Sequence, residues 1–118
     1  MDTATAQEFA SDWLVAWNAH DLGAILGHFS DDVVFTSPLA LRIVEGSDGV
    51  IRGKAKLSAY WSEGLRQSPE LHFEIEDLYI GVNSVVIHYR NHSGGLVNEV
   101  LVFDGPLVIE GHATYLIA

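Results

Sequence analysis

Glu99 is the residue whose type and surroundings point most directly to chemistry. In the apolar segment 96–103, the two-residue period of a strand places Glu99 on one face with Val97 and Leu101. A carboxylate within an apolar row is costly to bury unless it is paired or protonated. We therefore predict that Glu99 lies in an interior pocket, with Val97 and Leu101 in its wall. It is either an acid that contacts a ligand or the structural ion-pair partner of Arg90.

Histidines on the two neighbouring apolar segments are the candidate bases. His88 and Arg90 share one face of the segment before Glu99, and His112 lies in the segment after it. Histidine is the side chain that most often acts as a general base, so either one is a candidate to take a proton from a ligand at Glu99. A hydrogen-bonded structural role is the alternative for each. The remaining histidines are expected at the surface or in turns: His20, His28, His72 and His92.

Aromatic residues at helical spacing are the candidate ligand contacts. Tyr60 and Trp61 lie in one apolar helical stripe, and Trp13 and Trp17 lie in another. Such residues more often belong to a core than to a ligand platform. A tyrosine hydroxyl beside a pocket can nevertheless orient a polar ligand atom, so these four residues are candidate binding residues.

The composition argues against several classes of function. Asp and Glu number 16 against 6 Lys and Arg, and the resulting charge of -10 repels nucleic acid and anionic membrane surfaces. The chain has no cysteine, and it has no metal-binding pattern such as H-E-x-x-H, so neither a metal nor another cofactor is expected. No segment approaches the ~18 apolar residues of a membrane span, and the N-terminal segment lacks the features of a secretory signal. A soluble cytoplasmic protein is expected.

The spacing of apolar residues predicts helices in the first half of the chain and strands in the second. The first half is expected to contain a helix over 7–20, a second helix capped by Asp21, a strand over 33–36, a loop over 45–53 and a third helix around 57–65. A β-meander is expected to follow, with strands over 71–82, 84–92, 96–103 and 107–118. The apolar phase shifts within 71–82, which predicts a bulge. One α+β domain over 1–118 results, with helices on one face of a mostly antiparallel sheet.

Three segments carry a resemblance to a known family. WNAHDLGAILGHFSDDVVFTSP, GKAKLSAYW and VNEVLVFDG closely resemble SnoaL-like proteins of the nuclear transport factor 2-like superfamily. The resemblance implies a cone-shaped α+β barrel, in which three N-terminal helices pack on a curved sheet around a small-molecule pocket. The family includes isomerases, dehydratases, epoxide hydrolases, polyketide cyclases and non-catalytic binders, so the fold alone does not fix the function.

Ketosteroid isomerases of this superfamily allow a comparison residue by residue. Their general base, an aspartate before a proline, falls on Ser37, and their oxyanion-hole tyrosine falls on Trp13. Their oxyanion-hole aspartic acid falls on Glu99, and the same comparison places His112 and Tyr60 at pocket positions. The resemblance thus supports an inward Glu99 but not steroid isomerisation.

These observations lead to one main hypothesis and two alternatives. The main hypothesis is a lyase, isomerase or cyclase acting on an apolar, carbonyl-bearing ligand, with a histidine as base and a protonated Glu99 bonded to the enolate. If Arg90 keeps Glu99 ionised, Glu99 would instead orient a histidine or act as the base. The first alternative is a non-catalytic ligand-binding or dimerisation domain. The second alternative is water activation as in epoxide hydrolases. It ranks lower because it needs two acids flanking an arginine, and only Glu99 and Arg90 are evident in the sequence.

The resemblance also implies a homodimer. An outer sheet face carrying Ile87, Tyr89, Val100 and Val102 would supply the apolar surface for it. The alternation in the segment 84–92 leaves a second choice open, in which Ile87 and Tyr89 point inward instead.

Overall fold

Helices dominate the first half of the chain and strands the second, as the apolar spacing predicts. The computed structural model describes residues 1–117. Its elements are α1 (Thr3–Asn18), α2 (Leu22–Leu26), β1 (Phe29–Thr36), α3 (Pro38–Ile43), β2 (Val50–Arg52), α4 (Lys54–Gln67), β3 (Glu74–Ile80), β4 (Ser84–Arg90), β5 (Leu96–Asp104) and β6 (Leu107–Tyr115). The three expected helices correspond to α1, α2 and α4.

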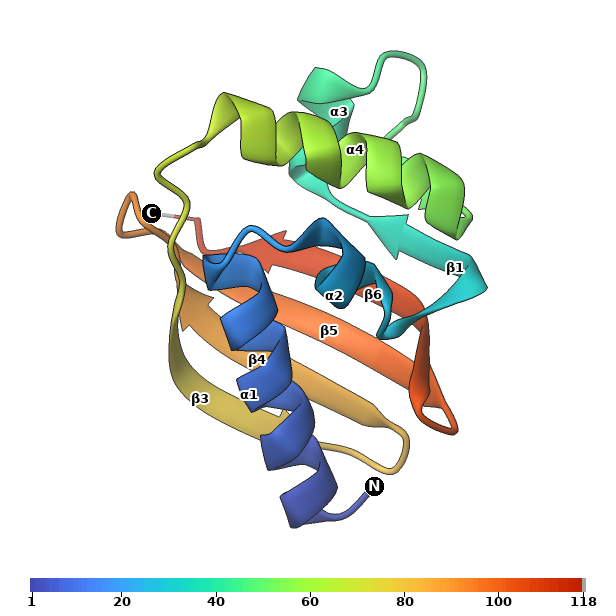
Figure 1. Ribbon diagram of the computed structural model, residues 1–118, viewed down its shortest axis with the longest axis vertical. Helices are drawn as coiled ribbons and strands as arrows, with labels where there is room; N and C mark the ends of the chain where they lie inside the picture. Colours follow the sequence, from blue (N-terminus) through green and yellow to red (C-terminus); the bar gives the residue numbers. More distant parts are fainter. Residues whose placement is uncertain (118) are drawn as a thin grey trace.

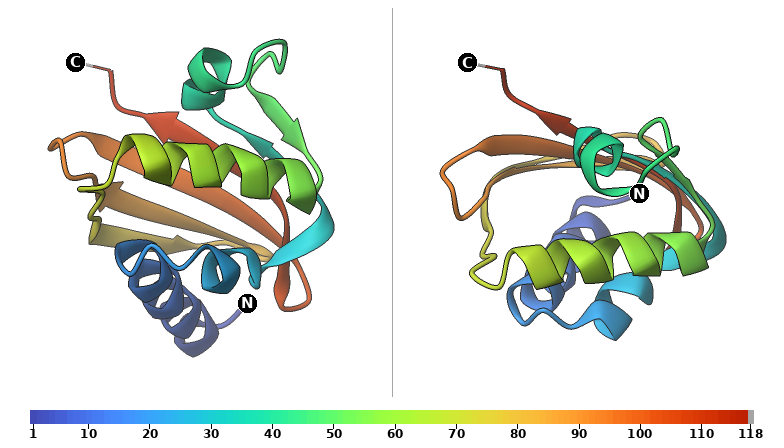
Figure 2. Two further views of the ribbon diagram at one scale, coloured as in Figure 1. Left: turned by 45° about the horizontal axis from the view of Figure 1, so that its top comes forward. Right: turned by 90° about the horizontal axis from the view of Figure 1, so that it is seen from above.

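The strands form one mixed sheet in the order β2-β1-β6-β5-β4-β3. All neighbouring strands are antiparallel except β1 and β6, which are parallel. Helices α1, α2 and α4 lie on one face of the sheet (Figure 1), and the sheet curves around them (Figure 2). The expected α+β class is therefore confirmed. The sheet is open, since β2 and β3 are its edges, so it is curved but not a closed barrel.

Irregularities in strand pairing accompany this curvature. The register of β3 against β4 shifts between Ile75 and Asp77, where the apolar phase change predicts a bulge. The register of β5 against β6 shifts between Val102 and Phe103. An extra residue on one strand bends it and increases its twist, which helps a sheet to wrap around a cavity.

Two short elements, α3 and β2, were not expected. Ser37 ends β1, as predicted, but its hydroxyl also caps α3 by accepting a hydrogen bond from the backbone N–H of Leu39 (3.2 Å). Pro38 then occupies the first turn of α3, a position that does not need its missing N–H. Strand β2 lies within the expected loop over 45–53 and pairs with β1.

The inward face of β4 carries Ile87 and Tyr89, which are 0% and 5% exposed. The expectation that these two residues belong to an apolar outer surface is therefore wrong. They point inward because β4 pairs with β5 in a register that sets Ile87 beside the buried Glu99. Val100 and Val102 of β5 are half-buried and alternate with its inward residues, so they lie on the outer face.

Aromatic rings fill the space between helices and sheet. Trp61 of α4 contacts Phe29 and Phe35 of β1 and Trp17 of α1, with ring centroids 5.1, 5.2 and 5.1 Å away. Edge-on aromatic contacts of this kind add to the stabilisation from burial. They fix α4 over the sheet, and α4 supplies one wall of the cavity described below.

Candidate functional site

Glu99 is the one carboxyl side chain buried in the core of residues 1–117. It lies in the middle of β5, beside Ile87 of β4 and Ala113 of β6, and is 3% exposed. The predicted inward orientation of Glu99 is confirmed. The period of two and the strand register both place it on the face that the helices cover.

Burial alone changes the protonation of Glu99. It raises the pKa of the carboxyl group from 4.5 to about 8, and neither a hydrogen bond nor a neighbouring charge contributes to the change. At neutral pH the group is therefore mostly a neutral carboxylic acid. In this form it has an O–H to donate, which a carboxylate lacks.

A cavity of about 140 Å³ lies against Glu99, between α4 and the concave face of the sheet. Its apolar wall consists of aromatic and aliphatic side chains: Trp17, Phe35, Leu39, Trp61, Leu65, Leu71, Phe73 and Ala113. Its polar groups come from Ser37, Ser68, Tyr60, Tyr89, Tyr115, Asn91, His92 and Glu99. A concave apolar site with a few convergent polar groups is the usual form of a small-molecule site.

Tyr60 and Ser37 form a buried hydrogen-bonded pair in the cavity wall. The hydroxyl of Tyr60 donates to Oγ of Ser37 at 2.9 Å. Burial raises the pKa of Tyr60, and this effect outweighs the opposing hydrogen bond to Ser37. The phenol therefore stays neutral and can orient a polar ligand atom.

Two further tyrosines stand near Glu99. Burial raises the pKa of Tyr89 and of Tyr115, and the negative charge that Glu99 carries once it has ionised raises both further. Both phenols are therefore neutral at physiological pH. The polar part of the cavity thus combines neutral hydroxyl groups with a neutral carboxylic acid.

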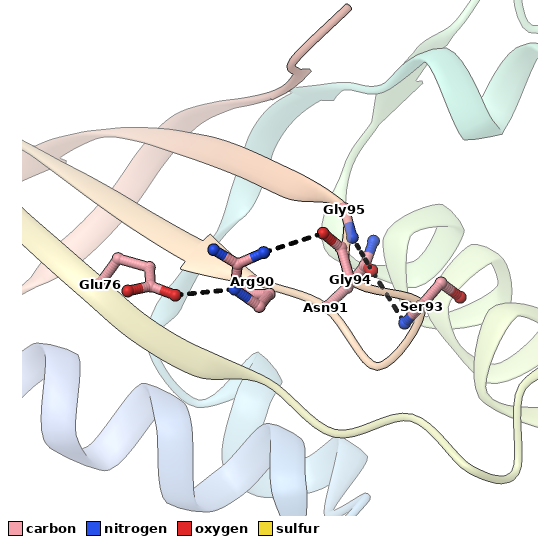
Figure 3. Close-up of polar contacts among 6 residues, drawn as sticks. All are labelled: Glu76, Arg90, Asn91, Ser93, Gly94 and Gly95. Carbon is pink, nitrogen blue, oxygen red and sulfur yellow. Dashed lines mark hydrogen bonds and ion pairs between the residues drawn. The ribbon is translucent and has the colours of Figure 1, made fainter. Parts of the chain in front are cut away.

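The ion pair between Arg90 and Glu99, one of the two alternatives for Glu99, does not form. Figure 3 shows that the Arg90 guanidinium instead bonds to Glu76 Oε1 through Nε (2.9 Å) and to the carbonyl of Gly94 (3.1 Å). Arg90 shares the outer face of β4 with His88, because Tyr89 between them points inward. Within residues 1–117, no cation consequently pairs with Glu99 to keep it ionised.

The two predicted bases lie on the outer face of the sheet. The Nδ1–H of His88 donates to Oδ1 of Asn98 at 2.7 Å. His112 pairs with the outward-facing Val100, donates from Nε2 to Glu110 (2.8 Å), and accepts at Nδ1 from the Thr36 hydroxyl (2.6 Å). Neither candidate base therefore lies in the wall of the cavity beside Glu99.

The predicted binding residues divide into two groups. Tyr60, Trp61 and Trp17 line the cavity. Trp13, Val97 and Leu101 are buried but do not line it. Trp13 packs against Phe73 and Tyr89, with ring centroids 5.7 and 5.1 Å away.

Several polar residues of the cavity are not predicted from the sequence. In the sequence, Ser37 stands out only as the substitute for a missing base, and Tyr89 only as an alternative inward residue. His92 is expected at the surface or in a turn; it lies in a turn, and its side chain also lines the cavity. Tyr115 could have been found from the two-residue period of β6, which sets it two positions after the inward Ala113.

Neither a metal cluster nor a membrane span stands out in the part of the chain that the structure describes. Residues 1–117 contain no group of three or more His, Cys, Asp or Glu side chains placed to hold a metal ion together. None of the helices over the same residues is long and apolar enough to cross a membrane.

Fold and cavity together define a class: an α+β domain in which helices and a curved, open sheet enclose a small apolar site with one buried acid. The sequence matches the SnoaL-like domain over residues 10–115, and the chain belongs to this family. No curated protein matches the sequence.

Solved structures agree with this assignment. A SnoaL-like protein of unknown function from Burkholderia thailandensis is 44% identical over 98% of both chains, with a TM-score of 0.93. AclR from Streptomyces galilaeus, described as a candidate hydroxylase, is 21% identical over 98% of this chain and 91% of its own, with a TM-score of 0.77. A candidate polyketide cyclase from Sinorhizobium meliloti is 11% identical over 91% and 94%, with a TM-score of 0.74. The last two show the shared fold alone.

Proposed function

We propose that this protein binds a small apolar molecule with a carbonyl group and acts on it by acid–base chemistry, as a lyase, isomerase or cyclase. The observation that carries the proposal is Glu99, a neutral carboxylic acid beside an apolar cavity, for which residues 1–117 supply neither a hydrogen-bond nor an ion-pair partner. Burying such a group costs free energy unless a partner satisfies it. A ligand oxygen that accepts its proton in a hydrogen bond would be that partner.

A carbonyl oxygen suits Glu99 better than other acceptors do. When a proton leaves the carbon beside a carbonyl, negative charge develops on the oxygen, and a hydrogen bond from a neutral acid then strengthens. A hydrogen bond beside apolar walls is worth more than the same bond in water. Tyr60 stands in the same wall and can orient the ligand.

The size of the cavity limits the ligand. Its volume of about 140 Å³ lies below the ~300–1,000 Å³ typical of sites for drug-sized molecules. Trp17, Trp61 and Phe73 supply flat apolar surfaces around it. A compact molecule with one ring or a short chain fits this description.

The competing function is a non-catalytic binding domain. One observation and one resemblance favour it: His88 and His112 face away from the cavity, and the resemblance to ketosteroid isomerases places Ser37 at the position of their base. In such a domain Glu99 and Tyr60 would only hold the ligand. The two functions differ in whether the bound molecule exchanges protons with water.

The test uses 2-indanone, a compact apolar ketone, dissolved in D2O with the purified protein. Loss of its α-proton signal by NMR reports enolisation, and the rate in buffer alone is subtracted. We expect the wild-type protein to accelerate exchange and Glu99→Leu, which removes the donor, to lower the rate by about 10²-fold or more. Glu8→Gln, at an exposed site on α1, is the control and keeps the wild-type rate.

The pH profile gives a second signature. Above pH 8 Glu99 becomes a carboxylate, which repels the enolate, so the protein-dependent rate should fall there. A Glu99→Leu rate within about twofold of wild type would overturn the role of Glu99. Binding of 2-naphthol without any protein-dependent exchange would establish the binding domain instead.

A further inference from the structure

Neither Glu99 nor the three tyrosines of the cavity can take a proton from the ligand. Enolisation needs a base beside the carbon that loses its proton, whereas Glu99 donates a hydrogen bond to the carbonyl oxygen. Tyr60, Tyr89 and Tyr115 are poor acceptors, because neutral phenols whose pKa is raised hold their protons. Among the residues of 1–117 that line the cavity, His92 is the only histidine.

We propose that His92, held by Glu70, is the base that takes the proton from the ligand, an inference that rests on the function proposed above. His92 lies in the turn between β4 and β5, where its side chain is 23% exposed and lines the cavity. Glu70 lies in the connection from α4 to β3. The two residues come from segments 22 positions apart and meet at the edge of the same cavity.

Glu70 lies beside one nitrogen of the His92 imidazole ring. Nε2 of His92 lies 3.3 Å from Oε1 of Glu70. A carboxylate beside Nε2 favours the tautomer that carries its proton there, which leaves Nδ1 as the proton acceptor.

The turn that carries His92 is tightly built. The side chain of Asn91 accepts hydrogen bonds from the backbone N–H groups of Ser93 (3.0 Å) and Gly95 (2.9 Å). Arg90, anchored on Glu76, holds the carbonyl of Gly94 (Figure 3). A catalytic group must be held close to its working geometry, and these bonds restrain the backbone on both sides of His92. Arg90 is thus a positioning residue for this turn.

The proposed step is balanced within the protein and its ligand. The bond between the α-carbon and its hydrogen breaks, and the proton passes to Nδ1 of His92. The electron pair forms the carbon–carbon double bond of an enolate, whose oxygen accepts a hydrogen bond from Glu99. The proton then returns from His92 to the same carbon or to a conjugated one. No oxidant, reductant or second substrate is needed.

The experiment compares His92→Gln with His72→Gln in the 2-indanone exchange assay. His72 is an exposed histidine of the neighbouring connection that does not line the cavity. We expect His92→Gln to slow exchange by about 10²-fold or more, because that is the usual contribution of a general base. His72→Gln should leave the rate within about twofold. Glu70→Gln should slow exchange by up to about fivefold, since Glu70 is 64% exposed and exposed ion pairs are weak.

Binding of 2-naphthol separates loss of the base from loss of the fold. Trp17 and Trp61 line the cavity, so a naphthol bound there would contact them and quench their fluorescence. We expect His92→Gln to bind 2-naphthol within about twofold of wild type and to keep its unfolding midpoint.

The outcomes distinguish this inference from the proposed function. If Glu99→Leu abolishes exchange while His92→Gln leaves it unchanged, the site is catalytic but His92 is not its base. If His92→Gln loses exchange and naphthol binding together, His92 supports the cavity rather than the reaction, and the inference fails. Absence of exchange in the wild-type protein would overturn both proposals.

Discussion

Replacing Glu99 by Gln should stabilise the protein at alkaline pH and not at acidic pH. Below its ordinary pKa the Glu99 carboxyl is neutral in both the folded and the unfolded chain. Above that value it ionises in the unfolded chain, while burial keeps it neutral in the fold until about pH 8. The free energy of unfolding therefore falls as pH rises between about 4.5 and 8, and this contribution is constant above that range.

The magnitude follows from the two pKa values. The difference between 4.5 and about 8, at about 1.36 kcal/mol per pH unit, corresponds to about 5 kcal/mol when it is fully expressed. Between pH 5 and pH 9 the titration covers most of this interval, or about 4 kcal/mol. Gln at position 99 does not titrate. Its buried amide adds an offset of about 1–3 kcal/mol that does not depend on pH.

Urea denaturation at pH 5, 7 and 9 measures this difference. The wild-type free energy of unfolding, relative to that of Glu99→Gln, should fall steadily over the series. Glu8→Gln, which removes an exposed carboxylate, is the control and should run parallel to wild type within about 0.5 kcal/mol. Parallel profiles for wild type and Glu99→Gln would refute the reasoning, because they would mean that Glu99 ionises equally in the folded and unfolded chains.

Two further predictions concern packing and assembly. A Cβ at Gly111 would lie 2.7 Å from Phe35, so Gly111→Ala should destabilise the fold by about 1–3 kcal/mol in urea. Gly64 in α4 has nothing within 4 Å of such a Cβ, so Gly64→Ala should stabilise by about 0.5–1 kcal/mol, and equal effects would contradict the packing argument. We also propose that two copies of the chain form a homodimer through the outer face of the sheet. Light scattering should then give a mass twice the 12.9 kDa of one chain. Val100→Glu should yield monomers and Val82→Glu, at a 91% exposed turn, should not; a wild-type monomer would exclude the dimer.

The position of Glu99 could be predicted because a strand has a strict two-residue period. Val97 and Leu101 flank it on the same face, so a shift of one residue would expose both and bury Asn98. The end of β1 at Ser37 could be predicted for a similarly local reason, since Pro38 disfavours continuation of the strand. Both inferences depend on neighbours in the chain and need no knowledge of the partner strands.

The inward face of β4 could not be settled in the same way. This strand carries apolar residues on both faces, with Val86 half-buried on one and Ile87 buried on the other. Local alternation is then ambiguous, and pairing with β5 decides which set faces the helices. The short helix α3 was missed for another reason, because Ser37-Pro38 ends a strand and begins a helix equally well.

His92 illustrates a different limit. No periodicity applies to a turn, and the side chain reaches the cavity only because the hairpin and the α4–β3 connection meet at its edge. Its contact with Glu70 therefore arises only when the chain is folded and cannot be inferred from neighbouring residues. From the sequence, His88 and His112 are the candidate bases because their strands neighbour that of Glu99. In the fold, both lie on the face of the sheet opposite to Glu99.

The instability that Glu99 causes bears on its role. A residue that only filled the core at position 99 could be Leu, which would avoid the cost of about 5 kcal/mol that the pKa of Glu99 implies at pH 9. That cost is comparable to the whole stability of a small domain. A ligand oxygen bonded to the neutral acid would recover part of it, and only while the site is occupied. Ligand binding should therefore stabilise the wild-type protein more than Glu99→Leu, and it should do so most strongly below pH 8, where the acid still holds its proton.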